Sequence, residues 1–420
     1  MRKIILSLLL FTSLQIFAQV NDNNTTNTTT EEYDAEIPES MRSDFQSQYN
    51  IWLKKNLVTD EKDCVSTDKS PIVDDSLIID RLSRIPSLIE MPFNEEVKKY
   101  IIRYSNNLRS KVSFMLGAGN FYIPTFEKAL DLYNLPIELK YLPVIESALD
   151  PLAVSRQGAT GLWQFMLATG KKYGLQHNSL IDERRDPIKS TWAAVNYLKD
   201  LYDIYNDWNL VLAAYNSGPG TVNKAIKRAG GDKDYWKICK FLPKETRGYV
   251  PAFIAANYIM TYYCEHGICP MSNELPKATD TIQIAKDLHL NQVADVCKID
   301  IEELRMLNPQ YKKDIIPGNS FVCSLRLPSD NIALFLENEK SIFEHKSDEL
   351  LTKRKVVALD DKVSSSSHNK SKRASVRHKV RSGDTLGSIA QKYGVTVSQI
   401  RRLNGIKGSR ITAGKTIKIK

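Results

Sequence analysis

A glutamate in an apolar run is the residue best placed for chemistry in this chain of 420 residues. Glu146 and Ser147 follow the apolar segment 142–145, and Gln164 comes eighteen residues after the glutamate in the sequence Gly-Leu-Trp-Gln-Phe-Met. Desolvation disfavours the charged form of a carboxyl, and a carboxyl that stays neutral at working pH donates a proton to a leaving group. The pattern indicates acid catalysis at Glu146. The alternative is a structural carboxyl in a helix cap or an ion pair.

Helices are expected to position this glutamate, because apolar residues recur with helical spacing from Pro92 to about residue 264. Pro136 suits the first turn of a helix that runs towards Leu149 and so contains Glu146. Pro143 removes one backbone donor inside that run and should bend it just before the glutamate. Three further helices are predicted over residues 191–205, 208–216 and 250–263.

Polar residues gather at the predicted helix ends and turns, where binding residues are often found. The candidates that accompany the glutamate are Ser155, Gln164, Met166, Tyr215, Asn216 and Tyr249. Glycosidases usually employ two carboxylates, yet the sequence shows no obvious partner for Glu146. Asp150 precedes Pro151, a position that favours a turn.

Two copies of one small module follow the helical region. Residues 290–308 align without a gap onto residues 386–404, at an offset of 96 positions, and Pro317-Gly318 falls on Ala413-Gly414. Equal spacing of a helix-like run, an Asn stop and a Gly turn indicates a repeated unit. Each copy is predicted to hold a strand, two short helices and a second strand. The expected fold class is a mainly α domain followed by small α+β modules of βααβ order.

The residues around Glu146 resemble the lytic transglycosylase family, whose catalytic domain is a goose-type lysozyme-like domain of glycoside hydrolase family 23. The resemblance covers roughly residues 92–265. Its motifs are Glu146-Ser147, Ser155, Gly158-Ala159, Gly161-Leu162-Trp163-Gln164-Phe165-Met166, Ala214-Tyr215-Asn216-Ser217-Gly218 and Tyr249-Val250. One departure is Leu167-Ala168, where the family often has Pro-Gly, and it changes a turn without removing a reacting group.

This resemblance implies a helical lysozyme-like fold and cleavage of peptidoglycan without water. Glu146 would protonate the β-1,4 bond between N-acetylmuramic acid and N-acetylglucosamine, and then act as a base towards the C6 hydroxyl, leaving a 1,6-anhydro end. The substrate's N-acetyl group would replace the second carboxylate. The residues that would bind the substrate or shape the pocket are Ser155, Gln164, Met166, Tyr215, Asn216 and Tyr249.

The second copy of the module, residues 377–420, resembles a LysM module, which binds glycans that contain N-acetylglucosamine. The resemblance implies that the loop Gly383, Asp384, Thr385 and Leu386 faces the glycan. The earlier copy, residues 279–328, has Asp287-Leu288-His289 at the corresponding place and is degenerate, so its glycan binding stays open.

Six cysteines are present, an even number that suits disulfides in an exported chain. They are Cys64, Cys239, Cys264, Cys269, Cys297 and Cys323. Cys297 and Cys323 map onto Tyr393 and Ile419 of the second module copy, which gives the hypothesis of a Cys297–Cys323 disulfide. No Cys/His pattern has zinc spacing, and we expect neither a metal nor a cofactor.

The N-terminus is typical of a cleaved secretory signal over residues 1–19. Arg2 and Lys3 precede an apolar run, Ile4 to Phe17, that is too short to cross a bilayer comfortably. An uncleaved membrane anchor is the alternative. The predicted location is therefore outside the cytoplasm, in the periplasm or cell envelope, with no retained transmembrane helix.

The C-terminal part of the chain is strongly basic. Residues 351–420 hold 18 Lys and Arg against 3 Asp and Glu, whereas the whole chain has a net charge of +9. A basic tail favours a polyanionic partner, and in an exported protein an acidic wall polymer or membrane surface fits better than nucleic acid. The alternative without a binding role is a solvated linker with a basic surface, and it suits much of residues 353–381.

The predicted organisation has six parts. They are a signal peptide 1–19, a partly disordered N-terminal arm 20–91, a catalytic domain 92–270, a degenerate LysM-like module 279–328, a linker 329–376 that is basic and Ser-rich at its end, and a LysM module 377–420. The expected partner is the peptidoglycan glycan strand, while other wall proteins and membrane contact stay open. Two other functions remain: a catalytically silent peptidoglycan-binding scaffold, and a hydrolytic lysozyme that requires a positioned water.

Overall fold

The computed structural model describes residues 64–272, 275–276, 278–354, 377–393, 395–406, 408–409 and 411–419. The predicted signal peptide, the first part of the arm and the basic Ser-rich stretch lie outside these residues. Buried apolar side chains form three cores, one mainly helical and two in small modules that contain strands. The predicted fold class is confirmed.

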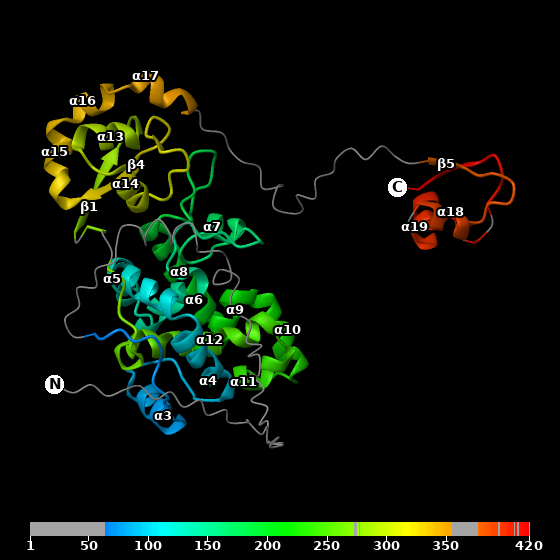
Figure 1. Cartoon of the computed structure of the whole chain (residues 1–420), viewed down its shortest axis with the longest axis horizontal. Coiled ribbons are helices and arrows are strands. Elements are labelled where there is room, and N and C mark those ends of the chain that lie inside the picture. Colours follow the sequence, from blue (N-terminus) through cyan, green and yellow to red (C-terminus); the bar gives the residue numbers. More distant parts are fainter. Residues whose placement is uncertain are drawn as a thin grey trace, which may run out of the picture.

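Helices contribute most of the first core (Figure 1), and loop residues such as Leu162, Trp163 and Phe165 complete it. Their bounds are α3 Asp75–Arg84, α4 Glu95–Ile102, α5 Arg109–Leu132, α6 Leu142–Ser147, α7 Leu167–Lys172, α8 Pro187–Tyr205, α9 Trp208–Ser217, α10 Pro219–Arg228, α11 Tyr235–Ile238 and α12 Lys244–Thr261. A π-helical turn, Arg103–Asn107, joins α4 to α5, and a 3-10 helix, Ile137–Tyr141, leads into α6.

The helix α12 is the central element of this core. Every residue from Tyr249 to Met260 is buried, as expected for a helix surrounded by others. The prediction placed its start at residue 250, but the helix begins at Lys244 and carries Pro251 inside. Because of this earlier start, the polar residues 244–248 belong to the same helix as Tyr249.

Local capping explains where the helices of the predicted pattern begin and end. The side chain of Asp186 accepts hydrogen bonds from the backbone N–H groups of Ile188 and Lys189 at the start of α8. Asn206 ends the same helix in the left-handed conformation, with φ of 55°. Gly218, with φ of 80°, ends α9 at the predicted Gly-Pro-Gly break.

The described part of the N-terminal arm is fixed to the helical domain. Cys64 forms a disulfide with Cys269, with a Cα–Cα distance of 5.7 Å. The guanidinium of Arg109 donates to the carbonyl oxygens of Thr67 and Gly267, both at 2.6 Å. The helix α3 also contributes buried apolar side chains to the first core. These contacts therefore join the arm to the C-terminal end of the helical domain.

The second core belongs to the degenerate LysM-like module. Its elements are β1 Thr279–Ile284, β2 Asp287–His289, α13 Leu290–Cys297, α14 Ile301–Leu307, β3 Ile315–Pro317 and β4 Cys323–Pro328. The strand β1 pairs with β4 and β2 with β3, all antiparallel. The predicted strand–helix–helix–strand order is present, with one additional pair of strands.

Residues 329–354, which were expected to be linker, are helical and packed. They form α15 Ile332–Glu337, α16 Glu339–Glu344 and α17 Ser347–Leu350. Phe335, Ile342 and Leu351 are buried in the second core. The linker prediction was wrong for this part, because apolar side chains spaced along the segment cover the module.

The predicted Cys297–Cys323 disulfide is wrong. Both cysteines are buried in the second core with free thiols, and the Cys323 thiol donates to the carbonyl of Phe321 at 3.4 Å. The alignment that suggested the pair fails after the second helix. The side-chain amide of Asn308 pairs with the backbone of Arg326, and Asn404 pairs in the same way with Lys418.

Asn308 and Asn404 are 96 positions apart, whereas their strand partners Arg326 and Lys418 are 92 apart. The first copy therefore has four extra residues between its second helix and its last strand. Cys323 therefore corresponds to Lys415 and not to Ile419. The pairing also shows that Asn404, the last residue of the second helix in its copy, holds the last strand, while Gly405 with φ of 64° ends that helix.

The third core lies in the second copy of the module. Its elements are β5 Arg377–Lys379, α18 Leu386–Tyr393, α19 Val397–Asn404 and β6 Thr416–Lys418, with β5 antiparallel to β6. In the part of the chain that the structure describes, no helix is both long and apolar enough to cross a membrane.

Candidate active site

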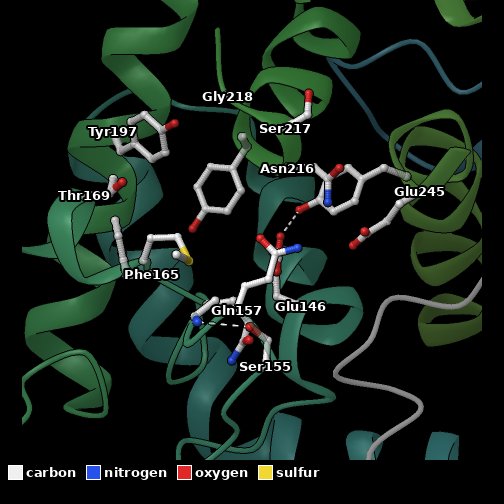
Figure 2. Close-up of a pocket in the computed structure, with 15 residues that line it drawn as sticks. Glu146, Ser155, Gln157, Phe165, Thr169, Tyr197, Asn216, Ser217, Gly218 and Glu245 are labelled. Atoms are coloured by element: carbon white, nitrogen blue, oxygen red, sulfur yellow. Dashed lines mark hydrogen bonds between the residues drawn. The ribbon is translucent and has the colours of Figure 1, made fainter. Parts of the chain in front are cut away.

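One pocket of about 370 Å³ collects all the residues that the sequence singled out in the helical domain. Glu146 lies at its centre, as Figure 2 shows. The predicted residues that line it are Glu146, Ser155, Gln164, Met166, Tyr215, Asn216 and Tyr249. A volume of this size is typical of a binding cleft.

The short helix α6 holds Glu146 rigidly. Leu142, Val144 and Ile145 are fully buried, so apolar packing fixes the backbone from which the glutamate projects. The helix ends directly after it, because Ala148 and Leu149 adopt left-handed φ values of 52° and 62°. Non-glycine residues in this region store backbone strain, which tends to occur at functional sites.

Buried hydrogen bonds join the glutamate's helix to the segment that carries Gln164. The Ser147 hydroxyl donates to the carbonyl of Leu162 at 2.9 Å. The indole N–H of Trp163 donates to Thr191 Oγ1 at 2.9 Å, and the Tyr215 hydroxyl donates to the Trp163 carbonyl at 2.8 Å. The residues flanking Glu146 and Gln164 therefore position these two side chains against a common framework.

The environment of Glu146 favours its neutral form. Burial raises the pKa of Glu146 to about 8, a hydrogen bond from the Tyr249 hydroxyl to Oε1 opposes this rise, and the charge of Glu245 adds to it. Burial also raises the pKa of Tyr249 well above its ordinary value, so the phenol remains a donor. A neutral carboxylic acid aimed into a polar pocket is suited to general acid catalysis.

The expectation that Glu146 has no carboxylate neighbour is wrong. Glu245 lines the same pocket and approaches it from the side of α12 (Figure 2). Sequence reasoning missed it because the helix was predicted to begin at residue 250. Glu245 and Tyr249 are four positions apart on α12, and residues at that spacing share a helix face.

Three other pocket residues, Gln157, Thr169 and Tyr197, lie outside the motifs named from the sequence. The ring of Tyr197 lies 5.3 Å from that of Tyr215, and together they form an aromatic wall. No local signal marks these residues, because they come from a loop and from helices α7 and α8.

Several predicted site residues also organise the pocket's own backbone. The Ser155 hydroxyl accepts a hydrogen bond from the Ala159 N–H at 3.0 Å. The Gln164 side-chain amide donates to the Gly161 carbonyl at 2.9 Å, and the residue has φ of 47°. Asn216 Oδ1 accepts from the Thr246 hydroxyl at 2.8 Å. Each amide and hydroxyl is therefore held in place before any ligand binds.

Asp150 lies outside the pocket lining and has the turn role predicted for it. Its Oδ1 accepts a hydrogen bond from the Leu152 N–H at 2.8 Å. Burial raises the pKa of Asp150 to about 6, with this hydrogen bond acting in the opposite direction.

The predicted glycan loop of the last module divides into exposed and internal parts. Gly383 and Thr385 are exposed, and Gly383 has φ of 89°. Asp384 accepts hydrogen bonds from the Arg381 N–H and from His378 Nε2, both at 2.8 Å, while Leu386 is buried in the third core. Asp384 and Leu386 thus shape the loop, whereas Gly383 and Thr385 are exposed, and Thr385 Oγ1 accepts a hydrogen bond from the Ser388 N–H at 3.1 Å.

The corresponding loop of the first copy is closed by internal contacts. Asp287 accepts a hydrogen bond from the Asn319 N–H at 3.0 Å, and the His289 side chain caps α13. Over the described residues, no group of three or more His, Cys, Asp or Glu side chains is arranged to hold a metal ion.

Comparison with known families agrees with this arrangement. A transglycosylase SLT domain matches residues 124–238, the LysM-like domain of lytic transglycosylase MltD matches residues 278–343, and a LysM domain matches residues 378–420.

Among curated proteins, membrane-bound lytic murein transglycosylase D of Escherichia coli (strain K12) is 32% identical over 335 residues, covering 78% of this chain and 70% of that protein. Membrane-bound lytic murein transglycosylase F of Maricaulis maris (strain MCS10) is 37% identical over 137 residues, or 29% of this chain and 28% of that protein.

The solved soluble lytic transglycosylase SLT70 of Escherichia coli has 28% identity and a TM-score of 0.30, over 34% of this chain and 24% of its own. The relationship to transglycosylase D extends over most of both chains. The chain therefore belongs to the lytic transglycosylase family that combines an SLT domain with LysM modules.

Proposed function

We propose that this protein cleaves the β-1,4 bond between N-acetylmuramic acid and N-acetylglucosamine in peptidoglycan without adding water. The observation that carries the proposal is the buried Glu146 in a cleft of about 370 Å³, hydrogen-bonded to Tyr249 and with a pKa that burial raises to about 8. Membership of the lytic transglycosylase family supports the substrate class and the reaction class.

Glu146 would act first as an acid and then as a base. The Tyr249 hydroxyl donates a hydrogen bond to Oε1 of Glu146, so the acid proton would sit on Oε2, from which it can reach the substrate. That proton moves to the glycosidic oxygen as the C1–O4 bond breaks. The carboxylate so formed takes the proton of the muramic acid C6 hydroxyl while O6 bonds to C1. The acid is regenerated, and the product ends in a 1,6-anhydro ring.

The remaining pocket residues would hold the sugar in place. The amide of Asn216 and the exposed side chain of Met166 line the cleft, and the rings of Tyr197 and Tyr215 offer an aromatic surface. Sugar rings pack on aromatic faces while amides bind the N-acetyl group and hydroxyls. The N-acetyl group would stabilise the developing positive charge at C1.

Glu245 supports a second candidate function, hydrolysis. A carboxylate in the same pocket is what an inverting or retaining glycosidase needs beside its acid. The charge of Glu245 also adds to the rise in the pKa of Glu146, an effect that favours the acid in either scheme. The product decides between the two: an anhydro end supports our proposal, and a reducing end with an added water supports hydrolysis.

The C-terminal LysM module would tether the enzyme to the wall, and we infer that it works at the cell wall after export. The test compares purified full-length protein with the Glu146→Gln variant on isolated peptidoglycan. We expect the variant to release no muropeptides while it sediments with the wall as the wild type does. Lysis near the wild-type rate would remove Glu146 from the mechanism. Sedimentation without lysis by the wild type would favour a silent scaffold.

A further inference from the structure

The degenerate LysM-like module shares its core with the active-site domain. Leu180 and Ile181 come from the loop between α7 and α8, and both are buried in the second core among residues of the module. Main-chain bonds join the same strip: the Asp182 N–H donates to the Gln310 carbonyl at 2.9 Å, and the Lys312 N–H donates to the Leu180 carbonyl at 2.8 Å. We name residues 177–182 the docking strip.

A lysine of the module reaches across this junction. Lys312 Nζ donates to the Asn178 carbonyl at 2.7 Å and contacts His177 Nε2 at 3.0 Å. Burial, with the charge of Lys312 next, lowers the pKa of His177, which keeps the ring neutral and able to accept this hydrogen bond. The ammonium thus binds two groups of the docking strip.

The docking strip in turn holds a buried arginine. Asp182 accepts two hydrogen bonds from Arg184, from Nε at 2.9 Å and from Nη2 at 2.8 Å. Burial, the largest single cause, raises the pKa of Asp182, but the hydrogen bond and charge of Arg184, with the charge of Lys312 and other neighbours, together lower it below its ordinary value. Arg184 is 7% exposed, so this bidentate ion pair is fixed by its surroundings.

The remaining nitrogen of the same guanidinium, Nη1, binds the wall of the active-site pocket. Arg184 Nη1 donates to the Gly158 carbonyl at 2.9 Å and to the Phe165 carbonyl at 3.1 Å. Phe165 lines the pocket, and residues 157 and 159 beside Gly158 line it too. The backbone of Arg184 also packs closely against the pocket wall at Gly161, where a Cβ atom would lie 1.8 Å from the Arg184 carbonyl oxygen.

We propose that the LysM-like module is a buttress of the catalytic domain, which sets the pocket wall 157–166 through Arg184, and that Arg184 is a positioning residue for the reaction. The proposal rests on the function proposed above. Lys312 binds the Asn178 carbonyl, and the Asn178 N–H donates to the Ile181 carbonyl at 2.9 Å. The chain then continues into Asp182, whose carboxylate holds Arg184 against the pocket wall. The closed glycan loop of this copy agrees with a structural use of the module.

Adjacent lysines provide the test. In the full-length protein, Lys312→Ala removes the ammonium that binds the docking strip, whereas Lys313→Ala removes an exposed neighbour and serves as the control. We expect Lys312→Ala to lower kcat on a soluble glycan fragment about tenfold or more, since small displacements of positioning groups have effects of that size. Lys313→Ala should match wild type. Lys312→Arg should restore most of the rate, because a guanidinium can donate to both Asn178 and His177.

Hydrogen exchange supplies a readout that needs no catalysis. The amides of Thr160 and Phe165 bond to each other's carbonyls across the pocket wall, both at 3.1 Å. We expect these amides to exchange faster in Lys312→Ala and at the wild-type rate in Lys313→Ala. In the unaltered chain, the exchange rates of these two amides and of the Asp182 and Lys312 amides should depend on denaturant concentration in the same way, because one local unfolding event exposes them all.

Arg184→Lys gives a second variant that keeps a cation beside Asp182. A lysine is a single point donor and does not reproduce the fork that joins Asp182 to both wall carbonyls. We expect the same loss of kcat and the same faster wall exchange. Unchanged kcat and unchanged wall exchange in both Lys312→Ala and Arg184→Lys would overturn the buttress. Absence of anhydro products from the wild type would overturn the proposed reaction and leave the exchange result to judge the buttress.

Discussion

The Tyr249 hydroxyl donates a hydrogen bond to Oε1 of Glu146 across 103 positions of sequence. This bond lowers the pKa of Glu146, while burial, the largest cause, and the charge of Glu245 raise it. The result, a pKa of about 8, keeps the acid protonated at neutral pH. The two smaller contributions to this pKa, the Tyr249 hydrogen bond and the Glu245 charge, come from one face of α12. Each can be removed by a single substitution.

Tyr249→Phe should move the alkaline limb of the pH–rate profile upward. The acid works in its protonated form, so activity falls as the pH rises through the pKa of Glu146. Without the hydrogen bond that lowers this pKa, the fall should begin at higher pH. The maximal rate should drop about tenfold, since the carboxyl loses its orientation. The rate of muropeptide release across the pH range measures both effects, and a limb that moves downward would contradict the assignment.

Glu245→Gln should move the same limb in the opposite direction. The substitution removes a negative charge that raises the pKa of Glu146, so the acid ionises at lower pH. Glu90→Gln, at an exposed position outside the pocket, is the matched control and should leave the profile unchanged. Loss of all activity in Glu245→Gln at every pH would instead assign Glu245 a direct chemical role.

Glu146→Gln should stabilise the fold at neutral and alkaline pH. The folded-state pKa of about 8 lies above the ordinary value of 4.5, so the unfolded chain binds fewer protons between these values. The wild type therefore loses stability as the pH rises from about 4.5 to about 8. Thermal unfolding should give a higher Tm for the variant at pH 8 and nearly equal values at pH 4. Equal Tm values at both would show that the glutamate is well solvated.

The Cys64–Cys269 disulfide should stabilise the helical domain without taking part in the chemistry. The Cys64→Ser/Cys269→Ser double variant should lose about 2–4 kcal/mol of unfolding free energy in urea, because the unfolded chain is no longer constrained. Below its transition it should keep the wild-type rate. Cys239→Ser, at a thiol outside any disulfide, is the control. Unchanged stability of the double variant would mean that the bond is absent in the folded protein.

The last module should bind the wall partly through charge. Arg377 and Lys418 lie directly opposite each other on the exposed face of the β5–β6 pair, with Lys379 beside them. Like charges across a strand pair destabilise it, and an anionic polymer would relieve that repulsion. Arg377→Gln/Lys418→Gln should weaken sedimentation with peptidoglycan at low salt and match wild type at high salt. A deficit that persists at high salt would point to lost folding or direct glycan contacts.

The sequence located the site well where residues stand in ordered motifs. Glu146, Gln164, Asn216 and Tyr249 were predicted from four separate segments, and the fold brings them to one pocket. Glu245 was missed for one reason: the boundary of α12 was placed a turn and a half too late, which hid its helical relation to Tyr249.

Contacts between distant segments were beyond prediction from local patterns. Nothing near Arg184 indicates that it binds the carbonyls of Gly158 and Phe165, or that Leu180 is buried in another module. The disulfide hypothesis failed because four extra residues in the first module copy shift Cys323 out of register with Ile419. Local spacing predicts elements, while these relationships depend on tertiary packing.

Digestion of peptidoglycan in water labelled with heavy oxygen distinguishes ring closure by the C6 hydroxyl from attack by water. We expect products released by the wild type to carry 1,6-anhydro ends and no heavy oxygen, because the C6 hydroxyl supplies the atom that bonds to C1. Glu146→Gln should release none of them. Reducing ends labelled with one heavy oxygen would instead show that the enzyme is a hydrolase in which a water attacks C1, with Glu245 as the carboxylate best placed to direct it.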